Sequence, residues 1–227
     1  MSTAPRLAGH ALHRRFGSNR AEVNALICVD IEVPAGQLTV VTGPSGSGKT
    51  TLLNLLGGLD RPTSGEVVLD GTQALSKLPE ASLLATRRDR IGYVFQTFGL
   101  IPVLSAAENV EAPLRIRGTE PAQRAQRVAA ALDRVGLTRH AHQRPHELSG
   151  GQQQRVGVAR ALVGDPDILI ADEPTGQLDS DTASRIMDLI VELTHERGLA
   201  SVVSTHDPLL IARADRVIRL LDGAVVT

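Results

Sequence analysis

The clearest chemical signal in the sequence is a glycine-rich segment that ends in a lysine and a threonine. Residues 43–50 read Gly-Pro-Ser-Gly-Ser-Gly-Lys-Thr and match the phosphate-binding loop pattern G-x-x-x-x-G-K-[ST]. In such a loop the backbone N–H groups point at phosphate oxygens, the lysine binds the β and γ phosphates, and the hydroxyl ligates Mg²⁺. A glycine-rich turn with an exposed lysine is the alternative. The residues that we expect to bind nucleotide here are Gly43, Pro44, Ser45, Gly46, Ser47, Gly48, Lys49, Thr50 and Thr51, with Lys49 also catalytic and Thr50 a magnesium ligand.

Two adjacent carboxylates, Asp172 and Glu173, follow the apolar run at residues 168–171. Side chains alternate across a strand, so the two acids should point in different directions and divide the work. We expect Asp172 to help hold Mg²⁺, and Glu173 to face the attacking water as the general base. Without the phosphate loop, an acidic pair after an apolar run is often only the start of a helix.

A third segment, Leu-Ser-Gly-Gly-Gln-Gln-Gln-Arg at residues 148–155, places a serine and two glycines before a helix-permitting run. This is a second helix start that could bind an anion. On spacing alone, however, the simpler interpretation is favoured, in which Ser149 caps its own helix and the glycines make the turn. The chain therefore has two helix starts that could bind phosphate, although one bound nucleoside triphosphate would need only one of them.

The elements that must position these residues alternate between strands and helices. Short strands are predicted in the front third and after residue 160, and the middle of the chain is helical with expected breaks at Pro113, Gly118 and Pro121. This order predicts a mostly parallel sheet covered on both faces, with ligands at the carboxyl ends of its strands. The predicted strands are 25–33, 38–42, 66–69, 167–171, 200–204 and 216–221, and the predicted helices are 52–59, which stops at residues 60–62, the lobe 106–135, and 181–196.

Composition excludes several classes of protein. The 227 residues carry 24 Lys plus Arg against 25 Asp plus Glu, and only 2% are aromatic, so neither a bulk polyanion binder nor a base-stacking platform is expected. No apolar run approaches the roughly eighteen residues of a membrane-spanning helix. The first sixteen residues lack a sustained apolar stretch, so no secretory leader is expected and a cytosolic address is predicted. Cys28 is the only cysteine, which excludes an internal disulfide.

Two other groups of residues carry weaker signals. His140, His142 and His146 could be imagined as a metal site, but they lie in a proline-containing linker without an obvious carboxylate, so we expect a solvated linker. The basic run at residues 86–90 could suggest nucleic acid, but in a nearly neutral chain a solvated or salt-bridged patch is expected instead. No nucleic-acid partner is predicted.

Taken together and in this order, the phosphate loop, the segment at 148–155 and Ile-Leu-Ile-Ala-Asp-Glu-Pro at 168–174 resemble the nucleotide-binding subunits of ATP-binding cassette (ABC) transporters over nearly the whole chain. The resemblance implies an α/β fold of the P-loop NTPase type, the ABC ATPase fold, with a RecA-like core, an antiparallel β subdomain and a helical subdomain. It implies one domain over 1–227. The core and β subdomain would span 1–97 and 163–227, and the helical subdomain with the signature motif would span 98–162.

The resemblance also implies a site shared by two subunits, with ATP and Mg²⁺ as cofactors. Two chains would form a head-to-tail homodimer in which Ser149, Gly150, Gly151 and Gln152 bind the nucleotide held by the partner's phosphate loop. The remaining roles implied are Gln96 as a catalytic residue and magnesium ligand that hinges the helical lobe, His206 as a catalytic contact to the γ phosphate, Asp172 as a magnesium ligand through water, Asp179 in a loop across the dimer interface, and Phe16 as an adenine-stacking ring. Core packing is the alternative for Phe16. Gln177 stands where asparagine is expected, which affects contacts in the Asp179 loop.

The segments at 95–102 and 104–110, with Pro-Thr-Gly at 174–176, are similar to the branch that contains the LolD, MacB and FtsE ATPases. This branch implies an ATPase that couples hydrolysis to an integral membrane permease for export or extrusion, peripheral on the cytoplasmic face of the membrane. An FtsE-like mechanotransmitter without transport is the alternative, and an ABC ATPase acting on DNA or ribosomes is a third. Phe98, Leu100 and Ile101 could form the docking surface or be buried in the helical lobe.

Overall fold

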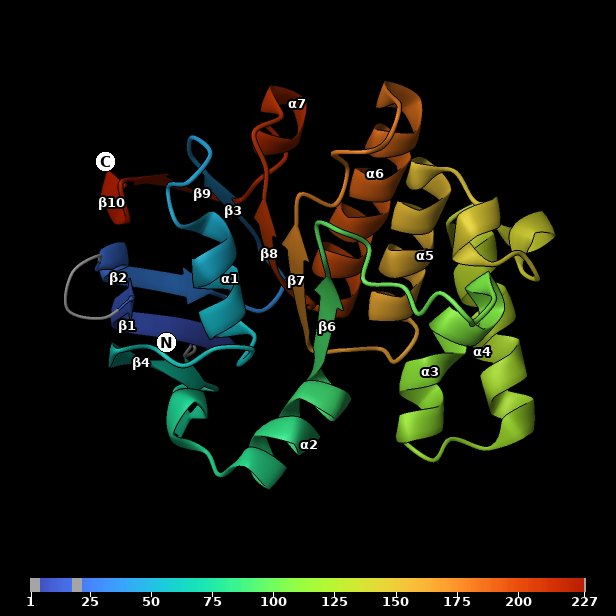
Figure 1. Ribbon diagram of the computed structural model, residues 1–227, viewed down its shortest axis with the longest axis horizontal. Coiled ribbons are helices and arrows are strands. Elements are labelled where there is room, and N and C mark those ends of the chain that lie inside the picture. The colour runs from blue at the N-terminus through green and yellow to red at the C-terminus, as the bar shows by residue number, and fades with distance from the viewer. Residues whose placement is uncertain (1–4, 18–21, 227) are drawn as a thin grey trace.

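The computed structural model describes residues 5–17 and 22–226, which build two sheets and the helices around them (Figure 1). Residues 1–4, at the start of the segment where no leader is expected, lie outside the described residues. One sheet is antiparallel, with four strands in the order β2-β1-β4-β5, and the other has six strands in the order β10-β9-β3-β8-β7-β6. The strands are β1 (Leu7–Phe16), β2 (Val23–Val33), β3 (Leu38–Thr42), β4 (Ser64–Leu69), β5 (Gln73–Ala74), β6 (Ile91–Val94), β7 (Ile168–Asp172), β8 (Ala200–Ser204), β9 (Arg216–Leu221) and β10 (Ala224–Val226).

The helices cover both faces of the six-stranded sheet. In Figure 1, α1 lies between this sheet and the antiparallel sheet, whereas α5 and α6 lie on the other side with α3 and α4 beyond them. We use the name helical lobe for α3, α4, α5 and the turns that join them. The helices are α1 (Lys49–Leu56), α2 (Glu80–Arg90), α3 (Ala106–Ile116), α4 (Pro121–Arg134), α5 (Gly150–Leu162), α6 (Ser180–Arg197) and α7 (Pro208–Ile211), with short 3-10 turns at Leu75–Lys77, Thr138–His140 and Pro145–Glu147. Among the described residues, no helix is long and apolar enough to cross a membrane.

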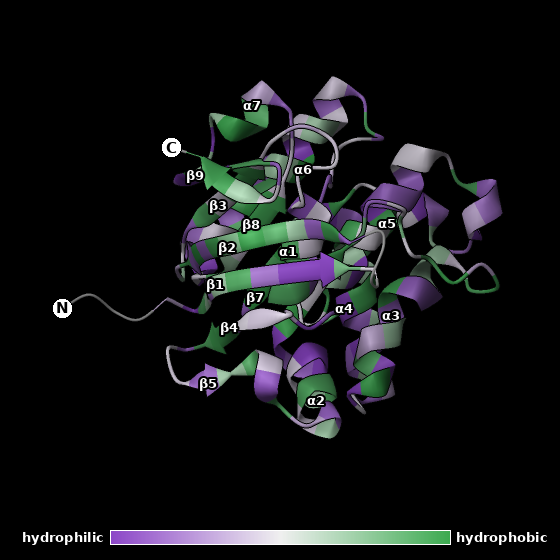
Figure 2. Ribbon diagram, turned by 60° about the vertical axis from the view of Figure 1, so that its left-hand side comes forward, coloured by the Kyte–Doolittle hydropathy of each residue, from purple (hydrophilic) through white to green (hydrophobic). Residues whose placement is uncertain are grey.

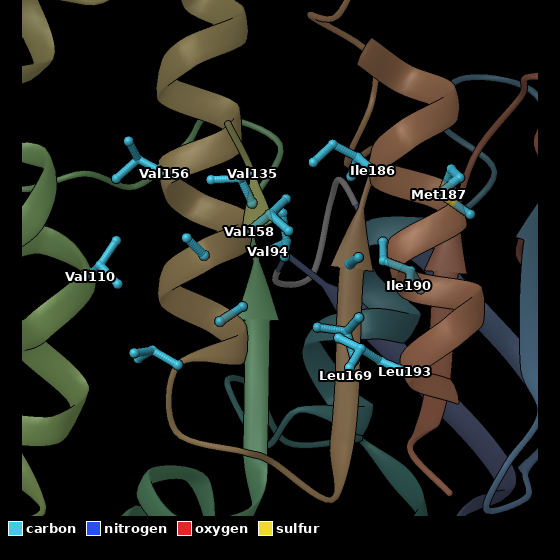
Figure 3. Close-up of a cluster of buried hydrophobic side chains, with 14 of the residues drawn as sticks. Val94, Val110, Val135, Val156, Val158, Leu169, Ile186, Met187, Ile190 and Leu193 are labelled. Carbon is cyan, nitrogen blue, oxygen red and sulfur yellow. The ribbon is translucent and has the colours of Figure 1, made fainter. Parts of the chain in front are cut away.

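The core has two parts, one on each face of the sheet. Alternate residues of β7 point to opposite faces, so Ile168 and Ile170 join the cluster with α1 and the antiparallel sheet, whereas Leu169 and Ala171 join the cluster with α5 and α6. Figure 3 shows the second cluster, in which side chains of α5 and α6 meet those of β6 and β7. Hydropathy colouring in Figure 2 shows how strongly hydrophobic residues concentrate in the strands of this sheet. Because the sheet is packed on both faces, it is a rigid support for the loops that leave its strand ends.

The parallel order brings four strand ends together. Strands β3, β8, β7 and β6 are parallel neighbours, so their carboxyl ends lie at one edge of the sheet. Along the chain these strands lead into the phosphate loop, His206, Glu173 and Gln96 respectively. The mostly parallel sheet covered on both faces is confirmed, with β10 as its antiparallel edge strand.

Several local predictions need correction. Pro113 does not break a helix but lies inside α3, where it removes only one backbone donor and only three residues follow it. Helix α1 ends at Leu56 rather than Leu59, because Gly57 caps it and packs against the ring of Tyr93. Strand β7 extends to Asp172. The structure adds β1 and α2, which the sequence pattern did not predict.

The basic run at residues 86–90 lies on α2 and its ion pairs explain it. Arg88 pairs with Asp89, and Arg90 binds both Asp70 and Asp167. The interpretation as a salt-bridged patch is confirmed, because these charges are neutralised within the chain and tie α2 to the start of β7.

Candidate functional site

A cavity of about 910 Å³ opens at the edge of the sheet where the four parallel strands end. It is lined by most of the residues predicted from the sequence, brought together from four separate loops. The predicted residues on its wall are Gly43, Pro44, Ser45, Gly46, Gly48, Lys49, Thr50, Thr51, Gln96, Asp172, Glu173 and His206. Val23, Asn24, Ala25, Asp222 and Gly223 also line the cavity and were not predicted. They come from β2 and the β9–β10 hairpin, and no motif marked them.

The phosphate loop is shaped by close contacts that only glycine permits. At Gly43, φ is +151° and a Cβ atom would lie 2.1 Å from the carbonyl oxygen of Leu220; at Gly48, φ is +101° and a Cβ atom would lie 2.4 Å from that of Ala25. The loop therefore lies in close contact with β9 and β2, and a loop of this kind can present its backbone N–H groups to an anion. Lys49 Nζ donates to the carbonyls of Gly43 and Pro44 at 2.8 and 3.0 Å. In the described part of the chain Lys49 has no carboxylate partner, which leaves its charge for an anion.

Asp172 is held by two hydroxyl groups at the end of β7. The carboxyl Oδ2 accepts a hydrogen bond from Thr50 Oγ1 at 2.7 Å, and Oδ1 accepts one from Ser204 Oγ at 2.5 Å. Asp172 is only 4% exposed, so these bonds replace water for a buried carboxylate. Ser204 was missed by sequence reasoning, although a serine that ends an apolar strand next to the predicted site was a signal.

Glu173 leaves the strand through an unusual backbone conformation. Its φ of +47° lies in the left-handed region, and its N–H donates to both the carbonyl and the Oγ of Ser204 at 3.1 Å each. Its Oε1 lies 3.1 Å from Nδ1 of His206. The Glu173 side chain is 14% exposed and that of His206 is 78% exposed. The two acids therefore point in different directions, Asp172 toward Thr50 and Glu173 toward His206.

Gln96 is exposed at the cavity wall and sits in a tight turn after β6. The N–H of Phe98 donates to the carbonyl of Phe95 at 3.3 Å, which makes Gln96 and Thr97 the central residues of a β-turn. The turn places a side-chain amide on the wall of the same cavity as the phosphate loop.

A hard divalent cation fits the oxygen atoms at this site. The Thr50 hydroxyl and the Asp172 carboxylate are hydrogen-bonded to each other, and the Gln96 amide lines the same cavity. Hydroxyl, carboxylate and amide oxygens are the donors that Mg²⁺ accepts. In the described residues, this site included, no group of three or more His, Cys, Asp and Glu side chains could hold a metal ion, so a cation here would depend on the hydroxyl and amide oxygens as well. His140 is hydrogen-bonded to Gln143 and lies 3.3 Å from Gln152.

The serine of the third motif caps its own helix and is exposed. Ser149 Oγ accepts from the N–H of Gln152, and the Gln152 side chain accepts from the N–H of Ser149, which is a capping box at the start of α5. Ser149, Gly150, Gly151 and Gln152 do not line the cavity of their own chain. One chain does not bring the two phosphate-directed helix starts together.

The loop between the two sites contains Gln177 and Asp179. Gln177 lines the cavity, and its carbonyl oxygen would lie 3.1 Å from a Cβ atom on Gly151, so this loop packs on the start of α5. Asp179 is exposed and caps α6; the hydrogen bond from the N–H of Thr182 lowers the pKa of its carboxyl group.

Phe16 does not line the cavity, although it pairs with Val23, which does. It ends β1 with 42% exposure, and the guanidinium of Arg14 lies 4.4 Å above its ring. It is not packed into the core. Residues 18–21, which follow it closely, lie outside the described residues, and the adenine-stacking role stays a prediction. Of the three residues considered for docking, Ile101 is exposed, whereas Phe98 and Leu100 are partly buried in the helical lobe.

Comparisons with known proteins agree with this geometry. Residues 26–176 match the family model of the ABC transporter. The chain is 43% identical over 225 residues to the macrolide export ATP-binding/permease protein MacB of Hyphomonas neptunium, which covers 99% of this chain and 35% of that protein. It is 47% identical over 211 residues to the pyoverdine export ATP-binding/permease protein PvdT of Pseudomonas syringae pv. tomato, covering 93% and 32%. The chain thus spans about a third of the length of these two relatives.

A shorter relative and a solved structure match over most of their lengths. The ABC transporter ATP-binding protein YtrE of Bacillus subtilis is 46% identical over 204 residues, which is 90% of this chain and 88% of YtrE. The dimeric structure of MJ0796, a bacterial ABC transporter cassette, is 41% identical with a TM-score of 0.94 and covers 97% of both chains. The same cassette bound to ADP and Pi gives a TM-score of 0.93. The phosphate loop, the paired acids and the capped serine therefore stand in a known context, and the chain belongs to the ABC transporter family as an ATP-binding cassette.

Proposed function

We propose that this chain binds and hydrolyses ATP between two copies of itself and passes the conformational change to a membrane permease that exports a substrate. The observation that carries the proposal is the single cavity in which the phosphate loop, Asp172, Glu173 and His206 converge from neighbouring strand ends. Phosphoryl transfer to water needs mainly positioning and charge stabilisation, and these residues supply both.

Each residue has a distinct task. The loop N–H groups and Lys49 bind the phosphates, while Thr50, Asp172 and Gln96 hold Mg²⁺, which neutralises phosphate charge when it is bound. Glu173 orients the attacking water and accepts its proton at the carboxylate. His206 contacts Glu173 through Nδ1, which fixes the carboxylate, and its high exposure leaves the other edge of the ring free for phosphate.

The second copy supplies the donors that one chain lacks. Ser149 is exposed, and neither it nor the first residues of α5 line the cavity of their own chain, so a head-to-tail partner could place them on the γ phosphate. The dimeric structure of the similar cassette MJ0796 supports the pairing of two such chains. The exposed position of Asp179 suits a loop at such an interface.

This chain has a groove in which a membrane permease could dock. A second cavity of about 740 Å³ is lined by residues of α2, β6 and the helical lobe, and Leu84, Ile91, Phe95 and Ile116 contribute its apolar surface. An exposed apolar surface of this kind fits a protein partner. We place the chain on the inner face of the cell membrane, bound to the permease there. The similarity to proteins named for macrolide and pyoverdine export supports export over mechanotransmission.

The test is ATP-dependent dimerisation of Glu173→Gln, measured by size exclusion with light scattering. Removing the carboxylate should stop turnover and leave ATP binding intact, so the closed dimer should accumulate with ATP and Mg²⁺ but not with ADP. Glu173→Gln combined with Ser149→Arg is the matched control and should stay monomeric, because the arginine blocks the shared site. A Glu173→Gln variant that hydrolyses ATP at the parent rate would contradict the catalytic assignment.

A further inference from the structure

The turn that carries Gln96 is anchored firmly on its entry side. The ring of Phe95 stacks on that of Tyr93 with centroids 4.4 Å apart, and the Tyr93 hydroxyl donates to Asn54 Oδ1 at 2.8 Å. Burial, and then the charge of Asp172, raise the pKa of Tyr93, so the hydroxyl stays protonated as a donor. Asn54 lies on α1, the helix that the phosphate loop opens. The entry side of the turn is therefore fixed to the nucleotide site.

The exit side has a strained backbone. Phe98 has a φ of +60° and Gly99 has a φ of +58°, so two successive residues are left-handed. Glycine adopts this conformation readily, but a bulky residue such as phenylalanine does so only when its surroundings hold it there. Something in the structure must therefore stabilise Phe98.

Arg160 is the group that holds this segment. Its NH2 donates to the carbonyl of Phe98 at 2.9 Å and its NH1 donates to the carbonyl of Gly99 at 2.5 Å. Arg160 is partly buried, has no carboxylate partner among the described residues, and has a pKa lowered by burial. A guanidinium removed from water needs hydrogen-bond acceptors, and two carbonyls of one strained turn accept from two of its nitrogens.

The same helix face touches Phe98 at two more points. A Cβ atom on Gly157 would lie 3.5 Å from the Phe98 carbonyl oxygen, and one on Gly150 would lie 3.7 Å from the tip of the Phe98 ring. Positions 150, 157 and 160 share one face of a helix with 3.6 residues per turn. Phe98 therefore lies along α5 from its first residue to Arg160, and Ser149 caps that same helix.

We propose that Arg160 is a positioning residue that fastens the Gln96 turn to the helix capped by Ser149, so that the two sites move together. The inference rests on the proposed function, because that function gives Gln96 and Ser149 their roles. Arg160 and Phe95 also line the groove assigned to the permease, so a partner pressing there meets the fastened turn directly. Without Arg160, the left-handed segment relaxes and Gln96 loses its fixed place at the cavity wall.

The experiment compares Arg160→Met, Arg160→Lys and a matched control, Arg124→Met, in the full chain. Arg124 is a partly buried arginine of the same lobe that donates to Thr119 and Glu111 rather than to the turn. Amide hydrogen exchange of residues 95–104 is measured without nucleotide, and kcat, KM and nucleotide affinity are measured for ATP. In Arg160→Met we expect exchange of the turn at least about tenfold faster. We expect kcat at least about tenfold lower and nucleotide affinity within about twofold of the parent, because misplacing one group lowers turnover without weakening the phosphate loop.

The outcomes separate this inference from the proposed function. Arg160→Lys keeps a cation and hydrogen-bond donors, so it should fold and give an amide exchange rate and a kcat between those of the parent and Arg160→Met. Parent-like amide exchange of residues 95–104 in both Arg160 variants overturns the inference, whatever the hydrolysis rate. Equal losses of kcat in Arg160→Met and Arg124→Met would also overturn it, because they would reflect general destabilisation. A parent chain that hydrolyses no ATP would refute the proposed function, while the exchange comparison would still decide the role of Arg160.

Discussion

Replacing Ser204 by alanine tests how the acidic end of β7 is held. Ser204 is completely buried, and its Oγ both donates to Asp172 Oδ1 and accepts from the N–H of Glu173. Alanine keeps the Cβ atom and removes only the hydroxyl. The N–H of Glu173 still has the Ser204 carbonyl as an acceptor, so the loss falls mainly on Asp172, which keeps only Thr50 as a donor.

The size of the effect follows from the charge of Asp172. A hydrogen bond to a charged group contributes about 1.5–3 kcal/mol, so we expect Ser204→Ala to lower the free energy of unfolding by about 2 kcal/mol. For a chain of this size that corresponds to a fall in Tm of roughly 4–8 °C. A carboxylate that is no longer fixed should also bind its cation more weakly. We expect the Mg²⁺ concentration for half-maximal hydrolysis to rise by roughly tenfold, as when other residues that orient metal ligands are removed.

Ser201→Ala is the matched control for this measurement. Ser201 lies on the same strand, is equally buried, and shares a hydrogen bond of 2.6 Å with Thr194 Oγ1, in which neither group is charged. Loss of this hydrogen bond in Ser201→Ala should lower the free energy of unfolding by about 1 kcal/mol and leave the Mg²⁺ dependence of hydrolysis unchanged. Thermal unfolding without nucleotide and Mg²⁺ titrations of ATP hydrolysis check both variants. If Ser204→Ala unfolds like Ser201→Ala and needs no more Mg²⁺ than the parent, Ser204 does not position Asp172.

Two further predictions concern the phosphate loop and the helical lobe. Gly48→Ala should lower Tm clearly more than Gly46→Ala. Both positions have a positive φ, but only at Gly48 would a Cβ atom meet a backbone oxygen, which is that of Ala25 at 2.4 Å. Equal falls in Tm in the two variants would contradict this steric argument. Hydrogen bonds from Arg115 and then Arg124 lower the pKa of Glu111 from its ordinary value of 4.5. Its contribution to stability is therefore present above about pH 4.5 and lost as pH falls through the lowered pKa. Glu111→Gln should flatten the acid limb of a plot of Tm against pH, and an unchanged acid limb would show that these ion pairs do not contribute.

The sequence alone was enough to predict the residues of the nucleotide cavity that belong to local motifs. A phosphate loop is specified by residues next to one another, because its glycines, lysine and threonine act within one strand–loop–helix unit. The paired acids after an apolar run are equally local. The alternation of strands and helices then predicted a parallel sheet, and the parallel sheet brings the strand ends to one edge.

Elements with weak local patterns were missed. In β1 the alternation of buried and exposed residues is interrupted by a bulge between Gly9 and Leu12, where Ala11 has a φ of +46° and its N–H donates to Asp30. Helix α2 buries only Leu83 and therefore shows little apolar periodicity. Neither segment has a strong signal of its own, and each is fixed by pairing with distant parts of the chain.

The contacts that adjust the cavity were decided only by the tertiary structure. Ser204 meets Asp172 across 32 residues of chain, and Arg160 meets Phe98 across 62. The types of these residues say nothing about their partners, since a serine after an apolar strand or an arginine near the end of a helix has many possible neighbours. The sequence thus predicted which groups would bind phosphate and activate water. Packing of the sheet and the helical lobe decided which buried hydroxyl fixes the acid and which arginine holds the glutamine turn, because a buried polar group must bond to whatever the fold brings within reach.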